Sequence, residues 1–162
     1  MAGWRVLASL LEPGGTMRIG LYSERGRRAV VRARELIAER GFEPTPDGIR
    51  ACRAALRERA EDELFGKIVR NEDFYSMSGC RDLLFHVQEH RFELPQVKEM
   101  LAELRLPFIG FEFADSGMSI ERYRQRWPQD AERTNLDRWH VLEEAHPDTF
   151  ARMYQFWVRK PA

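Results

Sequence analysis

The sequence predicts an α/β fold in which three strands alternate with about six helices. Three observations carry this prediction. Apolar residues alternate with other residues over 16–22, directly after a Pro13-Gly14-Gly15 turn. Aromatic and β-branched residues, which favour strands, fill 107–113 and 154–159. Between these strands, apolar residues recur at the three- and four-residue spacing that is typical of helices.

The bulk composition is that of one globular domain, and we expect a single domain over 1–162. Hydrophobic residues make up 43% of the chain and charged residues 32%, which is ordinary for a globular protein. Lys plus Arg and Asp plus Glu number 26 each, so the formal net charge is zero and neither nucleic acid nor a membrane surface is favoured as a partner. The two cysteines, Cys52 and Cys80, stand alone. They predict no disulfide framework and a reducing, cytoplasmic location.

The N-terminal elements follow from local signals. A short helix is predicted over Trp4–Leu11, before the strand over 16–22. Ser23 is placed to cap a helix that runs to Arg40, and Gly41 is placed to end it. The arginines of this helix lie mostly off its apolar stripe, which predicts a solvated face.

Residues 42–94 are predicted to form a helical lid or insertion. It begins at Thr45-Pro46-Asp47, where a cap, a first-turn proline and an early acid mark a helix start. Four segments follow one another: a helix continuing, with a kink, to Val69, a turn-rich stretch over 71–79, a brief helix over 81–85 and an extended or irregular segment over 86–92.

The C-terminal part resumes the α/β pattern. A helix is predicted to start at Leu94-Pro95 and to lead into the strand over 107–113. Two helices, near 120–127 and 136–145, then precede the last strand over 154–159.

An ordered series of motifs carries a family resemblance: LEPGGTMRIGLYS, HVQEHRFELP, LPFIGFEF and MYQFWVRK. From about Trp4 to Lys160 the chain resembles the C-terminal portion of bacterial class I S-adenosylmethionine-dependent methyltransferases, a group sometimes fused to tetratricopeptide repeats. The resemblance implies a partial Rossmann-like domain whose three strands form a mixed half-sheet in the order 5-7-6. It also implies the acceptor-side part of a methyl-transferring enzyme. Arg105 departs from the pattern, because relatives commonly place glycine there as a helix stop.

The same resemblance implies that the cofactor site is missing. Such enzymes hold their cofactor with a glycine-rich loop after the first strand and an acid at the end of the second. This chain has neither motif, and Gly14-Gly15 precedes a strand instead of following one. We therefore assign no cofactor-binding residue. We expect S-adenosylmethionine, the cofactor of the full-length family, not to bind this chain alone, and the chain alone to be inactive or weakly active.

Seven residues are candidates for substrate binding, and no catalytic residue is assigned: Tyr22, Ser23, Tyr75, His86, Glu89, His90 and Arg91. The first two follow from position, because ligands of open α/β sheets bind beyond the carboxyl ends of strands. A structural reading stays open for each: Ser23 as a helix cap, and Tyr75 as part of a turn beside a buried aromatic ring.

The segment His86-Val87-Gln88-Glu89-His90 has two functional interpretations. As H-x-x-E-H it matches the inverted zinc-protease pattern, which needs a helix and a third ligand from elsewhere. The segment looks too broken for a helix, so a zinc hydrolase is only a third hypothesis and no metal ligand is assigned. By resemblance the segment caps the acceptor pocket. The structural alternative makes Glu89 and Arg91 surface charges and places the histidines in a hydrogen-bonded loop.

The strand over 16–22 also predicts a partner. Without the strand that precedes it in the full fold, one of its edges is bare, and a bare edge invites pairing with another chain. The partner is either a second copy or a missing N-terminal half. A non-catalytic interaction or regulatory module, pairing through this edge, is accordingly the alternative to the methyltransferase function. The sequence does not name the methyl acceptor.

Overall fold

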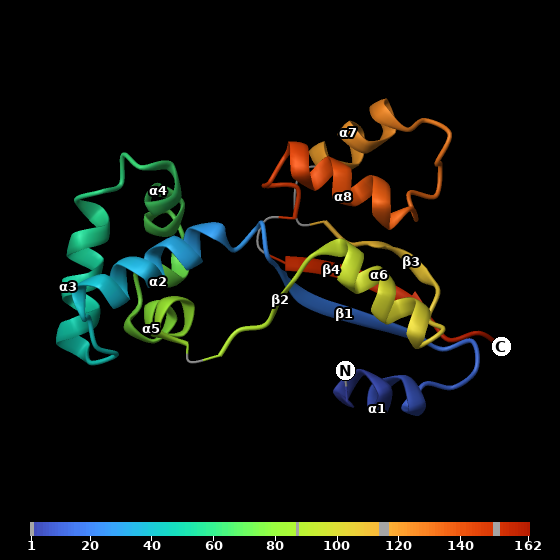
Figure 1. The fold of residues 1–162 in the computed structure, drawn as a ribbon, viewed down its shortest axis with the longest axis horizontal. Helices are drawn as coiled ribbons and strands as arrows, with labels where there is room; N and C mark the ends of the chain where they lie inside the picture. The colour runs from blue at the N-terminus through green and yellow to red at the C-terminus, as the bar shows by residue number, and fades with distance from the viewer. Residues whose placement is uncertain (1, 87, 114–116, 151–152) are drawn as a thin grey trace. The chain divides into compact units, whose positions relative to one another are not determined.

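The computed structural model describes residues 2–86, 88–113, 117–150 and 153–162 (Figure 1). The chain divides into two compact units. The sheet unit comprises Met1–Gly26 and His90–Ala162, and the helical unit comprises Arg27–Glu89. None of the described helices is long and apolar enough to cross a membrane.

The sheet unit holds a mixed four-stranded sheet in the order β2-β1-β4-β3. Its strands are β1 (Thr16–Ser23), β2 (Arg91–Phe92), β3 (Phe108–Phe111) and β4 (Met153–Arg159). β4 runs antiparallel to both β1 and β3, whereas β2 runs parallel to β1. The predicted α/β class is confirmed, and the three predicted strands are present with β4 between β1 and β3. The prediction of only three strands is wrong.

The fourth strand, β2, covers part of the edge that was expected to be bare. It pairs with β1 at Tyr22 and Ser23 only, and the backbone N–H of Glu24 donates to the carbonyl of Phe92 at 2.9 Å. A strand of two residues is too short to show an alternating pattern in the sequence. In the described part of the chain, Thr16–Leu21 has no strand partner on this side.

The two faces of the sheet differ. One face packs against helices of the same unit, α1 (Ala2–Leu10), α6 (Leu94–Glu103), α7 (Met118–Arg126) and α8 (Leu136–Ala145). The other face carries exposed polar side chains, among which Arg18 Nε donates to Glu112 Oε2 at 2.8 Å. Alternation along β1 explains the contrast, because Ile19 is buried while Arg18 and Gly20 are exposed. A mixed sheet with one solvated face follows from this pattern.

Local signals explain both ends of α6. The side chain of Gln96 accepts the backbone N–H of Glu93 at 2.8 Å in a capping box. After the helix, Arg105 has a φ of 53°, and the N–H of Leu106 donates to the carbonyl of Leu101 at 3.0 Å. This left-handed helix stop is the conformation that glycine adopts most easily. Arg105 therefore keeps the turn at a conformational cost of about 1 kcal/mol.

The helical unit contains α2 (Arg28–Arg40), α3 (Pro46–Arg57), α4 (Glu63–Val69) and α5 (Met77–Phe85), with a short 3-10 turn over Glu72–Phe74. The predicted start of α3 is confirmed, because Thr45 Oγ1 accepts the N–H of Gly48 at 3.2 Å. The predicted kinked helix from Thr45 to Val69 is wrong. It is two helices, because Asp62 accepts the N–H groups of Leu64 and Phe65 and so caps a new helix. This division contributes to the total of eight α-helices in the described residues.

Two further expectations about α2 are corrected. Ser23 does not cap this helix, because a turn intervenes and the helix begins at Arg28. The arginines near its start do not all form a solvated face. Arg27 is buried, and the side chain of Arg34 is only 21% exposed. Their partner, described below, comes from far along the chain and leaves no local signal. Gly41 ends the helix in the left-handed conformation, as predicted.

Candidate functional site

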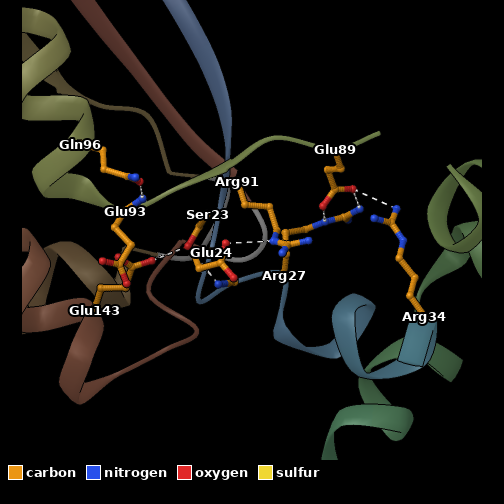
Figure 2. Close-up of polar contacts among 10 residues, drawn as sticks. Ser23, Glu24, Arg27, Arg34, Glu89, Arg91, Glu93, Gln96 and Glu143 are labelled. Atoms are coloured by element: carbon orange, nitrogen blue, oxygen red, sulfur yellow. Dashed lines mark hydrogen bonds and ion pairs between the residues drawn. The ribbon is translucent and has the colours of Figure 1, made fainter. Parts of the chain in front are cut away.

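A fully buried carboxylic acid lies at the carboxyl end of β1. Glu143 of α8 meets Ser23, the last residue of β1, and Tyr154 of β4, and none of the three side chains is exposed. We call these three residues the glutamate cluster. The Ser23 hydroxyl donates to Glu143 Oε1 at 2.5 Å, and the Tyr154 hydroxyl lies 2.8 Å from Oε2 and 3.0 Å from Oε1. Figure 2 shows Ser23 and Glu143 pointing toward one another.

Each member of the cluster is positioned by its own element. Tyr154 lies opposite Leu21 in the antiparallel pairing of β1 with β4. Ser23 is oriented by a turn, because its hydroxyl oxygen accepts the N–H of Gly26 at 2.9 Å and its own hydrogen is left for Glu143. Glu143 lies on the stripe of α8 that also buries Leu136 and Trp139. The fold therefore forces this carboxyl group into the core.

Burial raises the pKa of the Glu143 carboxyl. The hydrogen bonds from Ser23 and Tyr154 and the charges of Arg25 and His140 act in the opposite direction and do not offset burial. The pKa of the Tyr154 hydroxyl is raised as well, first by burial and then by the neighbouring carboxyl group. The cluster consequently favours an uncharged acid, held between two hydroxyl groups.

Charged side chains surround the cluster at the end of β1. Arg25 Nη2 lies 2.9 Å from Glu144 and 3.8 Å from Glu93. His140 Nε2 lies 3.9 Å from Glu144. Two buried nitrogen atoms of this group, Arg25 Nε and His140 Nδ1, have no hydrogen-bond partner in the described part of the chain. Buried polar atoms without a hydrogen-bond partner are rare in folded proteins.

The chemistry open to the glutamate cluster is positioning. Its carboxyl group has no exposed surface, so it does not contact a substrate in this conformation. It ties the end of β1 to β4 and α8 and so fixes the turn after Ser23. β1, β2 and β3 are mutually parallel, since β1 pairs parallel with β2 and both β1 and β3 oppose β4. Their carboxyl ends therefore lie at the same end of the sheet, and ligands of open α/β sheets bind beyond the carboxyl ends of the strands.

The structure places four of the seven candidate residues in the sheet unit and brings three of them together. Tyr22 lies opposite Arg91 in the β1–β2 pairing, next to Ser23. Arg91 Nε donates to Glu24 at 3.0 Å, as Figure 2 shows. His90 is exposed and directly precedes β2.

The other three candidates, Tyr75, His86 and Glu89, belong to the helical unit. Tyr75 is 56% exposed and lies beside the guanidinium of Arg57. His86 is exposed at the end of α5. The interpretation of Glu89 as a surface charge is wrong, because its side chain is only 3% exposed. The segment around it carries no signal for the distant arginines that cover it.

Glu89 is the centre of a buried ion-pair network. Arg27 Nε donates to Glu89 Oε1 at 3.0 Å while Arg27 Nη2 binds Oε2, and Arg34 Nη2 lies 3.2 Å from Oε2 (Figure 2). Arg34 also donates to the carbonyl groups of Leu83 and Leu84 at the end of α5. Burial pushes the pKa of Glu89 up, but the hydrogen bonds and charges of the two arginines outweigh burial, and the pKa lies below its ordinary value. Glu89 is therefore an anion.

The metal and cofactor interpretations gain no support from the side chains. Residues 86 and 88–90 are not helical, so His86 and His90 do not share a helix face, while Val87 lies outside the described residues. No group of three or more potential metal ligands occurs among the described residues. Gly14 and Gly15 serve the turn before β1. The N–H of Gly14 donates to the carbonyl of Lys160, and a side chain at Gly15 would collide with the backbone of Glu12.

Sequence reasoning missed the glutamate cluster and the arginines of the Glu89 network. One signal for Glu143 was present, because a carboxylate on the core-facing stripe of a helix must find hydrogen-bond partners. No comparable signal marks Arg27, since it stands in an arginine-rich stretch.

Two comparisons with known proteins were made. No family model matches the chain, and a search of curated proteins found no match either.

Proposed function

We propose that this chain is the C-terminal, acceptor-side part of a class I S-adenosylmethionine-dependent methyltransferase. One observation carries the proposal: β4 lies between β1 and β3 and runs antiparallel to both. The resemblance implies this arrangement for the last three strands of that Rossmann-like fold. The chain order also agrees, since β4, the central strand of the three, is the last of them in the sequence.

The proposed role of the sheet unit is to shape the acceptor side. The carboxyl ends of the parallel strands carry Tyr22, Ser23 and Arg91, with the glutamate cluster beneath them. In this proposal Glu143 is a positioning residue, because its buried acid group fixes Ser23 and the following turn without contacting a substrate. The methyl acceptor would bind beyond these carboxyl ends of the strands.

In this proposal the chain does not hold the cofactor by itself. The paired glycines that could have formed a cofactor loop precede β1, and their backbone groups are used by the turn. No step of methyl transfer is therefore assigned to side chains of this chain. The cofactor-binding strands of such an enzyme have to come from elsewhere.

Calorimetric titration with S-adenosylmethionine tests the cofactor part of the proposal. We expect no saturable heat from the isolated chain. Micromolar binding would contradict the proposal, because the chain would then hold a cofactor site of its own. The coding sequence directly upstream tests ancestry. A glycine-rich βαβ unit in any frame would support the proposal, and none in any frame would oppose it.

A second function, a non-catalytic interaction module, is favoured by one specific observation. β2 pairs with only two residues of β1, so most of that edge has no strand partner in the described part of the chain. Sedimentation of the purified chain tests this function. A monomer at high concentration that also recovers no partner would count against it.

A further inference from the structure

The open edge of β1 presents a regular set of backbone groups. Backbone groups alternate in direction along a strand, so residues two apart point to the same edge. The N–H of Glu24 donates toward β2, which means that the N–H and C=O groups of Thr16, Arg18 and Gly20 point to that same side. In the described part of the chain no backbone group pairs with these three residues there.

The helix before β1 carries exposed apolar side chains besides those that pack on the core. Trp4, Ala8 and Leu11 pack against the core of the sheet unit. Outside this contact, Val6, Leu7 and Leu10 are 59%, 52% and 73% exposed. Neighbouring apolar side chains that remain exposed mark an interaction surface.

We propose that a second copy of this chain binds to the edge of β1 and the outer face of α1. The two β1 strands pair antiparallel about a two-fold axis at Arg18. Thr16 then pairs with Gly20 of the partner subunit, and Gly20 with the partner's Thr16, so each outward-pointing residue of the open edge has a partner. This inference rests on the second proposed function, interaction, and does not need the methyltransferase proposal.

Self-complementarity argues for a second copy as the occupant. A two-fold interface needs one patch that matches itself, and three outward residues spaced evenly about Arg18 meet this condition for the backbone. An unrelated partner would have to bring both an open strand edge and an apolar helix face. A second copy brings both, because one short turn joins α1 to β1.

Charge does not oppose the pairing. The two Arg18 side chains would lie opposite one another, but each guanidinium is held by Glu112 of its own subunit through two hydrogen bonds, at 2.8 and 3.0 Å. The charged residue of α1, Arg5, is paired with Glu103. The chain as a whole carries no formal net charge, so two copies have no net repulsion at long range.

Analytical ultracentrifugation tests the proposal on the full chain. We expect a particle of twice the 19.1 kDa chain mass at about 100 µM protein. Leu10→Lys places a charge on the outer face of α1 and should weaken the dimer by about tenfold or more. Thr16→Pro removes one N–H of the open edge, at a strand start where proline is tolerated, and should weaken it too.

Met118→Lys is the matched control. Met118 is 53% exposed on α7, and its replacement should leave the dimer unchanged. Circular dichroism confirms that each variant folds. A wild-type monomer at this concentration would overturn the proposal, and so would a dimer that neither Leu10→Lys nor Thr16→Pro weakens. Both outcomes are independent of the S-adenosylmethionine titration, so the two proposals fail separately.

Discussion

Two buried glutamates of this protein have opposite charge preferences. Glu143 of the sheet unit is fully buried and its pKa is raised, whereas Glu89 of the helical unit has a side chain only 3% exposed and a lowered pKa. Burial by itself raises the pKa of both carboxyl groups. The partners differ, because Glu143 meets two hydroxyl groups and Glu89 meets two guanidinium groups.

The contrast shows that two factors together set the charge preference of a buried carboxyl group here: how strongly burial desolvates it and which groups it meets. A guanidinium supplies both hydrogen bonds and a full opposite charge, which can offset the cost of desolvation. A hydroxyl supplies only the hydrogen bond. The two sites therefore suit different tasks. Glu89 joins the two ends of the helical unit through an ion pair, while Glu143 holds the end of β1 through hydrogen bonds.

The largest expected difference between the two sites comes from replacing each glutamate with glutamine. Glu89→Gln leaves two guanidinium groups without their anion and should lower the free energy of unfolding of the helical unit by about 3 kcal/mol. Glu143→Gln keeps the shape of the side chain and places no charge in the core, so it should change the stability of the sheet unit by less than about 1 kcal/mol.

Amide hydrogen exchange measures this pair of variants, because it reports each unit separately. Tryptophan fluorescence during denaturation adds a second readout for the sheet unit, which contains Trp4, Trp127, Trp139 and Trp157. Equal losses for the two variants would break the comparison.

The pH dependence of stability should have opposite signs at the two sites. Glu143 has a raised pKa, so its contribution is fully present below 4.5, the ordinary value, and is lost as the pH rises through its folded-state pKa. Glu89 has a lowered pKa, so its contribution is present above 4.5 and is lost as the pH falls through its folded-state pKa. Denaturation across pH 3–8 measures both. Glu143→Gln should flatten the profile on the neutral side and Glu89→Gln on the acid side, and the reverse assignment would refute the comparison.

Ser23→Ala should cost about 1.5 kcal/mol in the sheet unit. Ser23 is fully buried and makes two hydrogen bonds, one to Glu143 and one from the N–H of Gly26. Thermal unfolding followed by tryptophan fluorescence measures the loss. Ser76→Ala, which removes the cap of α5 in the helical unit, serves as a control that should leave hydrogen exchange in the sheet unit unchanged.

A smaller loss than that of Ser23→Ala is expected for Tyr154→Phe, which should cost about 1 kcal/mol. The substitution keeps the packing of the ring and removes one hydroxyl donor from the Glu143 carboxyl. Because that donor favours the ionised form, the pKa of Glu143 should rise further. A lowered pKa in this variant would show that the tyrosine does not act as a donor. Chemical denaturation gives the energy, and a carboxyl titration gives the shift.

The sequence predicted those elements whose signals are local. The alternation over 16–22 identified β1, and Thr45 with Pro46 identified the start of α3, because strand periodicity and helix caps are read from neighbouring residues. β2 lies in the segment over 86–92 that was predicted as extended or irregular, but it was not identified as a strand because two residues carry no period. The break before α4 was missed because Asp62 looked like one more charge on a continuous helix.

The candidate site was less accessible to sequence reasoning because its contacts are distant in the chain. Ser23 and Glu143 are 120 residues apart, and Arg27 and Glu89 are 62 apart. A single sequence shows which groups need partners, but it does not pair them. The position of Ser23 at the end of β1 was predictable, whereas its buried acid partner was not.

The central claim, that the two buried glutamates have opposite charge preferences, is tested most directly by carboxyl ¹³C NMR titration of the intact chain. Glu143→Gln and Glu89→Gln assign the two resonances. The account predicts that Glu143 titrates above 4.5 and Glu89 below it. Two pKa values on the same side of 4.5, or in the reverse order, would contradict it.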